Sequence, residues 1–206
     1  TNLKPEETSQ YNVGVTWSSS CGDWLRHFSI SADGYYNTVK DKIVALPTMY
    51  VWKMMNMGEV DIKGVDVNLS TQFRLPLRMS LLLASTYSFQ YAVDVTDPEA
   101  KNYKDQIPYT PRHSGTVSVT VENPWVNVSY ILTAVGDRYA LPQNIDRNRI
   151  DSYIEQSISI NRDFRFRYFG LRLQGELLNL ANVNYDVIQY YPMPGRSWRL
   201  SICLSY

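Results

Sequence analysis

Soft thioether and aromatic side chains gather in one short segment of the chain. The members of this cluster are Met49, Tyr50, Trp52, Met54, Met55 and Met57. Thioethers bind soft metals such as copper, and Met-rich aromatic surfaces adapt to apolar organic ligands. The plainer interpretation is an external loop that packs on its neighbours. Together with a second aromatic pair, the candidate ligand-contact residues are Tyr50, Trp52, Met54, Met55, Tyr190 and Tyr191.

Other reactive side chains form no catalytic set. His27 and His113 lie near the starts of strands expected to begin at different ends of a sheet, so a shared haem or metal site is not expected. Cys21 and Cys203 are far apart in sequence, and we expect two free thiols, with a single bridge as the alternative. No nucleophile elbow, phosphate loop or zinc-ligand spacing is present. The sequence predicts no enzyme, no resident metal and no cofactor.

Charge and hydropathy exclude two further classes of protein. The 206 residues include 20 Lys and Arg and 20 Asp and Glu, which gives no electrostatic argument for nucleic acid as a partner. No apolar run is long enough for a transmembrane helix. A transmembrane barrel hides its apolar residues at every second position, however. The 16 Tyr and 5 Trp favour such a barrel, since these side chains are enriched at the boundary between apolar and polar surroundings.

Strict alternation of apolar and polar residues is the strongest pattern in the chain. In the last stretch Trp198, Leu200, Ile202, Leu204 and Tyr206 point one way, and the polar residues between them point the other. Similar alternation predicts nine strands, with Leu82, Ser85 and Ile131 out of phase. Their approximate ranges are 10–17, 26–38, 58–73, 78–92, 117–122, 125–133, 154–160, 169–177 and 198–206.

Short and long connections alternate between these strands. The long ones are centred on 46–56, 93–112, 136–149 and 182–195. An up-and-down antiparallel meander then places all short turns at one end and all long loops at the other, as in outer-membrane barrels. Compact soluble sheets rarely carry several such loops. The polar faces suit a wet lumen; a solvated face of a soluble sheet would look the same in any single strand.

Several segments carry a family resemblance. They are Leu3-Lys-Pro-Glu6, Tyr11-Asn-Val-Gly14, Ile62-Lys-Gly-Val-Asp66, Tyr109-Thr-Pro-Arg-His113, Gly136-Asp-Arg-Tyr139, Leu178-Asn-Leu180 with Tyr185, and Tyr191-Pro-Met-Pro-Gly-Arg196. Together they resemble the C-terminal part of the barrel of a TonB-dependent outer-membrane receptor. The last two segments are the most specific, and the resemblance covers essentially the whole chain.

This resemblance implies more strands than the chain contains. The family has an N-terminal plug inside a barrel of about 22 strands. Residues 1–206 would then be the C-terminal portion of the barrel, and the absence of an initiator Met also favours a fragment or a processed piece. Nine strands are an odd number and leave two unpaired edges, which hydrocarbon does not tolerate. The two edges could be covered in several ways. The rest of the barrel was removed or is a separate chain, or the barrel closes through another copy of this chain. A soluble fragment could also curl or exchange strands to cover its edges. We expect that the chain alone is not a transport-competent pore.

The resemblance also implies a function. It predicts an outer-membrane receptor of a Gram-negative bacterium that imports a scarce nutrient such as a siderophore, haem or cobalamin, of which cobalamin is slightly favoured. The implied partners are outer-membrane lipid, the remaining strands and plug, TonB through the absent N-terminal part, and the barrel-assembly machinery. That machinery is expected to recognise Trp198, Leu200, Ile202, Leu204 and Tyr206, although these residues could simply face lipid. The alternative function is a self-contained structural or adhesive β protein whose loops bind a partner.

Overall fold

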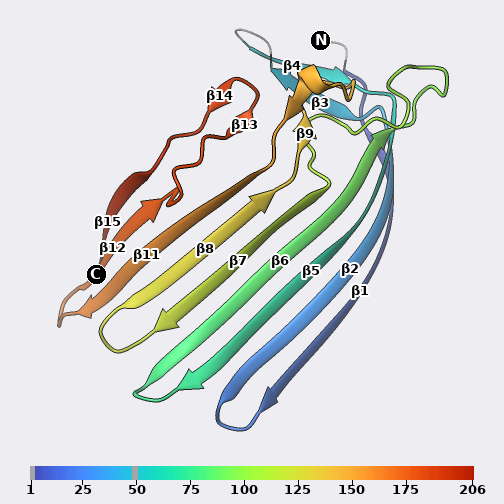
Figure 1. The fold of residues 1–206 in the computed structure, drawn as a ribbon. Helices are drawn as coiled ribbons and strands as arrows, with labels where there is room; N and C mark the ends of the chain where they lie inside the picture. The colour runs from blue at the N-terminus through green and yellow to red at the C-terminus, as the bar shows by residue number, and fades with distance from the viewer. Residues whose placement is uncertain (1–2, 48–50) are drawn as a thin grey trace.

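Nine long strands follow one another in an antiparallel meander (Figure 1). This computed structural model describes residues 3–47 and 51–206. In sheet order the strands are β1 (Glu7–Cys21), β2 (Leu25–Lys40), β5 (Glu59–Leu75), β6 (Met79–Asp94), β7 (His113–Glu122), β8 (Asn127–Val135), β11 (Tyr153–Arg165), β12 (Gly170–Leu178) and β15 (Ser197–Ser205). The predicted all-β fold, the nine strands and their meander are confirmed. Across the described ranges no helix is long and apolar enough to cross a membrane.

Three short hairpins and one turn of 3-10 helix decorate one end of this sheet. The hairpins pair β3 (Ile43–Pro47) with β4 (Trp52–Asn56), β9 (Arg138–Tyr139) with β10 (Arg149–Ile150), and β13 (Asp186–Ile188) with β14 (Tyr191–Pro192); the helical turn is η1 (Asp146–Asn148). The prediction of an irregular loop at 46–56 is therefore wrong. Val44 of β3 packs against a buried apolar cluster, and such a tertiary contact is invisible to local sequence pattern.

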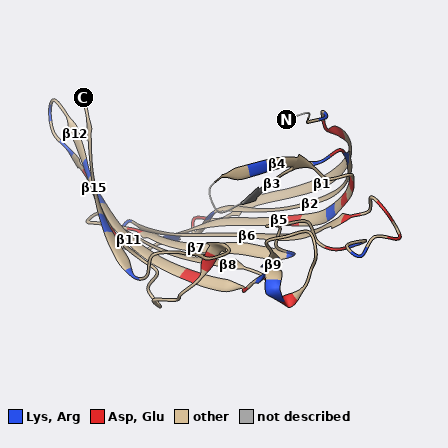
Figure 2. Ribbon diagram, turned by 90° about the horizontal axis from the view of Figure 1, so that it is seen from above, with Lys and Arg blue, Asp and Glu red and all other residues tan. Residues whose placement is uncertain are grey.

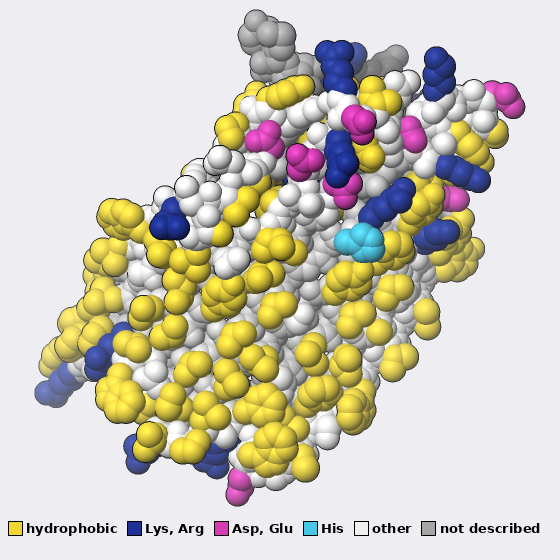
Figure 3. Space-filling model, viewed as in Figure 1, with side chains coloured by type: hydrophobic (Ala, Val, Ile, Leu, Met, Phe, Trp, Pro, Cys, Tyr) yellow, Lys and Arg dark blue, Asp and Glu magenta, His cyan; other side chains and the backbone are white. Residues whose placement is uncertain are grey.

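The cross-strand register separates an apolar face from a polar face. Val65 of β5, for example, lies opposite Gly34 of β2 and Phe89 of β6, whereas its neighbour Asp66 lies opposite Asp33 and Ser88. Viewed from above, the sheet is a curved trough with the β3–β4 hairpin on its concave side (Figure 2). Hydrophobic side chains cover the face seen in Figure 3, and charged side chains gather mainly where the long loops lie. The outer, convex face is apolar.

Rows of aromatic side chains bound the apolar face. Near the short turns, ring contacts join Trp17 to Phe28, Trp24 to Phe73 and Phe166 to Phe169, at centroid distances of 5.4, 5.7 and 4.6 Å. Toward the long loops, the cross-strand register places Tyr11 opposite Tyr36. Aromatic girdles at both margins of an apolar band are typical of transmembrane barrels.

A close approach between strands explains one glycine of the sheet. Gly64 is buried and lies opposite Tyr35. A Cβ atom at position 64 would overlap the phenol ring of Tyr35 and the backbone carbonyl of Phe89. The glycine therefore lets the tyrosine lie flat across the concave face.

We predict that Gly64→Ala lowers the free energy of unfolding by about 1–3 kcal/mol, the usual cost of overpacking. Urea unfolding of the refolded protein measures this change. Gly175→Ala is the matched control, because no atom lies within 4 Å of a Cβ at position 175. Equal stability of the two variants would contradict the proposed close contact.

Candidate functional site

The long connections all meet at one end of the sheet, which we call the loop end (Figure 1). They are the β3–β4 hairpin with its flanking residues and the segments 95–112, 136–152 and 179–196. The short turns 22–24, 76–78, 123–126 and 166–169 lie at the opposite end, which we call the turn end. The predicted separation of short and long connections is confirmed. Binding residues are concentrated on loops held by a rigid scaffold, so the loop end is the candidate functional site.

A small apolar cluster fixes the first two loops to the sheet. Its buried members and the side chains packed on them are Met57, Val60, Ala92, Ile107, Val44 and Ile62. The backbone N–H of Ile107 donates to the carbonyl of Ala92 at 3.0 Å, so segment 95–112 folds back onto β6. The thioether of Met57 is used in this core, and it is not available to a ligand.

Arg138 joins the third loop to the fourth. Its side chain is 4% exposed, and its Nη2 donates to the carbonyl oxygens of Asp186 at 2.7 Å and Val187 at 3.1 Å. The guanidinium carbon lies 5.6 Å from the ring centre of Tyr153 on β11. Within the described part of the chain, its buried Nη1 has no hydrogen-bond partner. One side chain thus ties segments 136–152 and 179–196 to the sheet.

Burial shifts the titration of the groups around Arg138. It lowers the pKa of Arg138 itself, while Tyr153, Tyr109 and Asp186 favour the charged form; a guanidinium nevertheless stays protonated in proteins. Burial also raises the pKa of Tyr109 and of Tyr185. Both phenols are therefore neutral at physiological pH, and the buried guanidinium of Arg138 lies near neutral phenol rings.

Asn179 organises the start of the last loop. It is 3% exposed, and its backbone lies in the left-handed region with a φ of 51°. Its Nδ2 donates to the carbonyls of Val183 at 2.9 Å and Pro194 at 3.3 Å, and its N–H donates to Oε1 of Glu155 at 2.9 Å. Asparagine tolerates this conformation better than most residues. These bonds close segment 179–196 on itself and onto β11.

The candidate ligand-contact residues lie on the exposed surface of the loop end. Trp52, Met54 and Met55 of β4 are 50%, 47% and 38% exposed, and the Trp52 ring lies 6.4 Å from that of Tyr109. Tyr190, in the turn between β13 and β14, and Tyr191, the first residue of β14, are 78% and 59% exposed. Tyr50 lies outside the described residues. The structure brings Trp52 onto segment 95–112, but no contact joins the described members of the two groups.

The remaining reactive side chains lie far from one another. His27 pairs with Gln72 near the turn end, and His113 begins β7 at the loop end, so their predicted separation is confirmed. Cys21 and Cys203 are free and exposed. Over residues 3–47 and 51–206, no group of three or more His, Cys, Asp or Glu side chains could hold a metal ion.

Comparison with protein families identifies the family to which this chain belongs. The sequence model of the TonB-dependent receptor-like β-barrel family matches residues 1–180. The chain belongs to the TonB-dependent receptor family. The resemblance inferred from the motifs is thereby confirmed, although its most specific segment, 191–196, lies beyond the matched residues. No curated protein matches the sequence.

Solved receptors and transporters share the fold at low identity. The ferric citrate transporter FecA, unliganded, has a TM-score of 0.74 at 12% identity over 98% of this chain and 32% of its own. The ferric preacinetobactin receptor BauA from Acinetobacter baumannii has a TM-score of 0.71 at 13% identity over 97% of this chain and 29% of its own. The copper transporter OprC has a TM-score of 0.70 at 17% identity over 99% of this chain and 31% of its own. The chain therefore spans 29–32% of the length of these structures.

Sequence reasoning found the segments that build the site but not what they do. Arg138 and Asn179 stand in the motifs 136–139 and 178–180, yet only the structure shows that each is buried and bonds to a distant carbonyl. Arg196 of the last motif likewise donates to the carbonyl of Leu180 at 2.6 Å. An arginine between loop residues, without an acidic neighbour at helical or strand spacing, is a weak signal by itself.

We predict that Arg138→Gln loosens segment 186–190, because two charged hydrogen bonds worth about 1.5–3 kcal/mol each are lost. Backbone hydrogen exchange in that segment should accelerate at least tenfold. Arg138→Lys should not restore protection, since an ammonium lacks the planar fork. The control is Arg149→Gln, which removes only exposed ion pairs to Asp137 and Asp151. Unchanged exchange in Arg138→Gln would refute the tethering role.

Proposed function

We propose that the chain is the C-terminal portion of the transmembrane barrel of an outer-membrane receptor in a Gram-negative bacterium. The receptor imports a scarce nutrient, a metal chelate, and is not an enzyme. The observation that carries this proposal is the combination of one continuous apolar convex face with long loops at a single end. Family membership supports it, and it favours transport over a self-contained adhesive role.

The apolar face has the height expected for a bilayer. On β5, Phe73 stands near the turn end and Lys63 stands near the loop end, ten residues apart. At a rise of about 3.3 Å per residue this is about 33 Å along the strand. With a tilt of about 40° the height becomes about 25 Å, which is the usual apolar band of an outer-membrane barrel.

The concave face supports a hydrated lumen. Arg172 donates to both carboxylate oxygens of Asp163, at 2.6 and 3.0 Å, and Arg199 pairs with Glu176. Ion pairs that water can reach carry little desolvation cost, whereas in a dry interior the desolvation of both charges would need full compensation. A plug domain inside the barrel would meet this polar wall.

The two open edges of the sheet are evidence that further strands pair with it. In the described chain β1 pairs only with β2, and β15 pairs only with β12, so each has one open edge. Unpaired backbone groups are not tolerated in hydrocarbon. We therefore assign the remaining barrel strands and the plug to parts of the receptor outside these residues. TonB would act through that plug to release the nutrient inward.

The nutrient is best assigned as a metal chelate bound at the loop end. Among the solved neighbours, two are named for ferric citrate and ferric preacinetobactin and one for copper. These names favour a ferric siderophore over cobalamin and haem. Exposed aromatic and thioether side chains on β4 and at the β13–β14 tip offer adaptable apolar contacts for an organic chelator.

We predict that Trp52→Ala in the full-length receptor weakens chelate binding about three- to tenfold, the usual range for one aromatic contact. A panel of ferric catecholate, ferric citrate, haem and cobalamin on whole cells identifies the ligand and measures the change. Trp24→Ala is the control, because Trp24 is 59% exposed, against 50% for Trp52, but lies at the turn end. Failure of every chelate to bind would refute the proposed function.

The last strand is our proposed assembly signal. Trp198, Leu200, Ile202 and Leu204 share one face of β15, Tyr206 follows the strand directly, and each of the five is at least 64% exposed. The barrel-assembly machinery could recognise such a row of exposed side chains during assembly. The same side chains would face lipid in the finished barrel.

We predict that removing Tyr206 from the full-length receptor reduces its folded amount in the outer membrane severalfold. Heat-modifiable mobility on gels reports the folded fraction. Cys203→Ser, on the opposite face of β15, should assemble normally. Wild-type levels without Tyr206 would contradict the assignment.

A further inference from the structure

A small cavity of about 250 Å³, which we call the Asp94 cavity, lies between three of the segments that form the loop end. Met55 of β4, several residues between 94 and 103, and Pro142 line it. Its volume is below the range of about 300–1,000 Å³ that is usual for the site of a whole small ligand. The cavity therefore fits one arm of a larger ligand.

The Asp94 cavity lies on the concave side of the sheet. Asp94 follows Ser88 by six residues on β6, and Ser88 lies opposite Asp66 on the polar face, so all three side chains leave their strands on that face. The β3–β4 hairpin, which contributes Met55, is also on the concave side (Figure 2). A ligand held at the loop end above the lumen can reach this position.

A buried carboxylate lines the cavity without a cation beside it. Asp94 is 6% exposed, and its Oδ1 accepts from the backbone N–H of Thr96 at 2.9 Å and from Thr96 Oγ1 at 2.5 Å. Its Oδ2 accepts from Nδ2 of Asn102 at 2.8 Å. These donors are neutral, and over residues 3–47 and 51–206 no ion pair involves Asp94. Since a carboxylate has about four acceptor sites, about one site and the full charge remain for a cation.

A close packing contact fixes this carboxylate in advance. A Cβ atom at position 58 would overlap the side chain of Thr96, so Gly58 makes room for that side chain. The backbone N–H of Glu59 donates to Thr96 Oγ1 at 2.9 Å. The hydroxyl of Thr96 is thus held between β5 and Asp94. Such preorganisation lowers the entropy that a ligand must lose on binding.

The other lining groups suit an alkylammonium. The carboxylate of Asp97 adds a second negative charge, and the thioether of Met55 adapts to a methylene chain. The ring of Tyr103 offers a π face to a cation. The ammonium of Lys104 lies 5.2 Å from the centre of that ring, so one primary ammonium of the chain itself is already drawn to it.

A metal ion fits the cavity less well. In the part of the chain that the structure describes, no group of three or more His, Cys, Asp or Glu side chains could hold one. Hard cations such as calcium need several oxygen ligands, and soft cations need several sulfur ligands. An ammonium needs acceptors for its three N–H groups and an apolar surface for its alkyl chain, which the mixed lining of this cavity provides.

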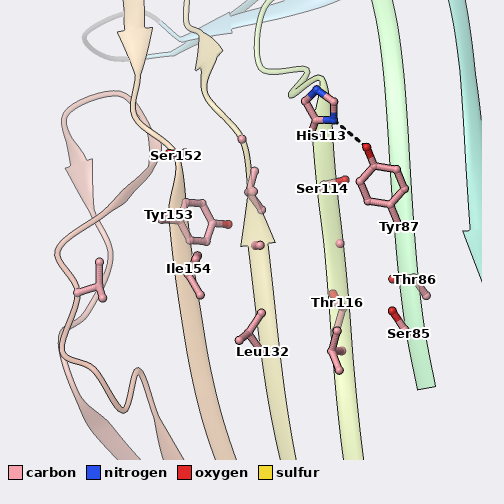
Figure 4. A pocket seen from close by; sticks show the side chains of 16 residues that line it. Ser85, Thr86, Tyr87, His113, Ser114, Thr116, Leu132, Ser152, Tyr153 and Ile154 are labelled. Atoms are coloured by element: carbon pink, nitrogen blue, oxygen red, sulfur yellow. Dashed lines mark hydrogen bonds between the residues drawn. The ribbon is translucent and has the colours of Figure 1, made fainter. Parts of the chain in front are cut away.

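A larger groove of about 700 Å³ on the convex face is a different kind of surface (Figure 4). Val117, Leu132 and Ile154 are part of its lining, and of the described residues that line it none is acidic. At its margin the hydroxyl of Tyr87 and Nδ1 of His113 lie 2.8 Å apart. This groove therefore offers no counter-charge to a cation, in contrast to the Asp94 cavity.

We propose that the Asp94 cavity binds a primary ammonium group at the end of an alkyl arm of the chelate. The ammonium bonds to the carboxylates of Asp94 and Asp97, and the methylene chain packs on Met55. This inference rests on the proposed function, and it narrows the nutrient to chelates that carry a free amine. Other groups of the receptor bind the rest of the chelate.

The test compares two ferric chelates that differ in one amine. Ferrioxamine B has a free primary ammonium at the end of an alkyl chain, and N-acetylferrioxamine B has the same iron-binding groups without that charge. Calorimetry on the full-length receptor in detergent measures both affinities. We expect ferrioxamine B to bind about tenfold more tightly, in line with one hydrogen bond to a charged group.

Two sets of variants should shift this preference in opposite directions. Asp94→Asn/Asp97→Asn should abolish it, because both charges are lost while the side-chain shapes are kept. Asp97→Asn alone changes an exposed side chain, which leaves the fold intact, and should lower the preference about threefold. Lys104→Gln should strengthen binding of ferrioxamine B about twofold, since it removes the ammonium that competes for the ring of Tyr103.

The matched control is Asp146→Asn/Asp151→Asn. It removes two carboxylates from segment 136–152, outside the lining of the Asp94 cavity, and should keep the wild-type preference. Equal binding of the two chelates, or an unchanged preference in Asp94→Asn/Asp97→Asn, overturns the proposal.

The same measurements separate this inference from the proposed function. A receptor that takes up another ferric chelate but does not bind ferrioxamine B refutes the ammonium site alone. A receptor that binds no metal chelate at all refutes the proposed function.

Discussion

Backbone hydrogen bonds between neighbouring strands are the interaction on which the whole molecule depends. Each of the nine strands of the main sheet pairs antiparallel with its neighbours, and apart from the open edges of β1 and β15 this ladder satisfies the peptide groups without water. Because successive side chains alternate between faces, the register also decides which residues lie on the apolar face and which lie on the polar face. A slip of one residue in any strand would exchange the two faces.

The sheet has almost no core of its own. The buried hydrophobic residues are few, and the cluster around Val60 lies under the loops on the concave side. The large apolar residues of the convex face remain exposed, among them Val13, Val65 and Leu200. The loops, by contrast, are held by contacts within the chain, namely the apolar cluster, the hydrogen bonds of the buried Arg138 and those of Asn179.

Sequence alternation was sufficient for the sheet because each strand obeys a local rule. All nine strands, their order and the two ends of the meander follow from period-two patterning and connection length. The out-of-phase Ile131 does not disturb the register. It lies opposite Ser118 and Ser157 on the concave face, without a bulge. The β3–β4 hairpin and the burial of Arg138 could not be predicted, since both depend on contacts between segments far apart in sequence. The motifs marked the right loops, but a motif does not reveal which carbonyl its side chain will reach.

The positions of the two free thiols carry a consequence for closure. Cys21 ends β1 and Cys203 lies on β15, so they stand on opposite edge strands. Eight strand spacings of about 4.8 Å separate the edges by about 38 Å along the sheet, whereas a disulfide requires Cα atoms within about 7 Å. A bond between these sulfur atoms therefore requires the nine strands to curl onto themselves or two copies to meet edge to edge. The two cysteines can therefore form a disulfide only when no other strands pair with the edges of β1 and β15.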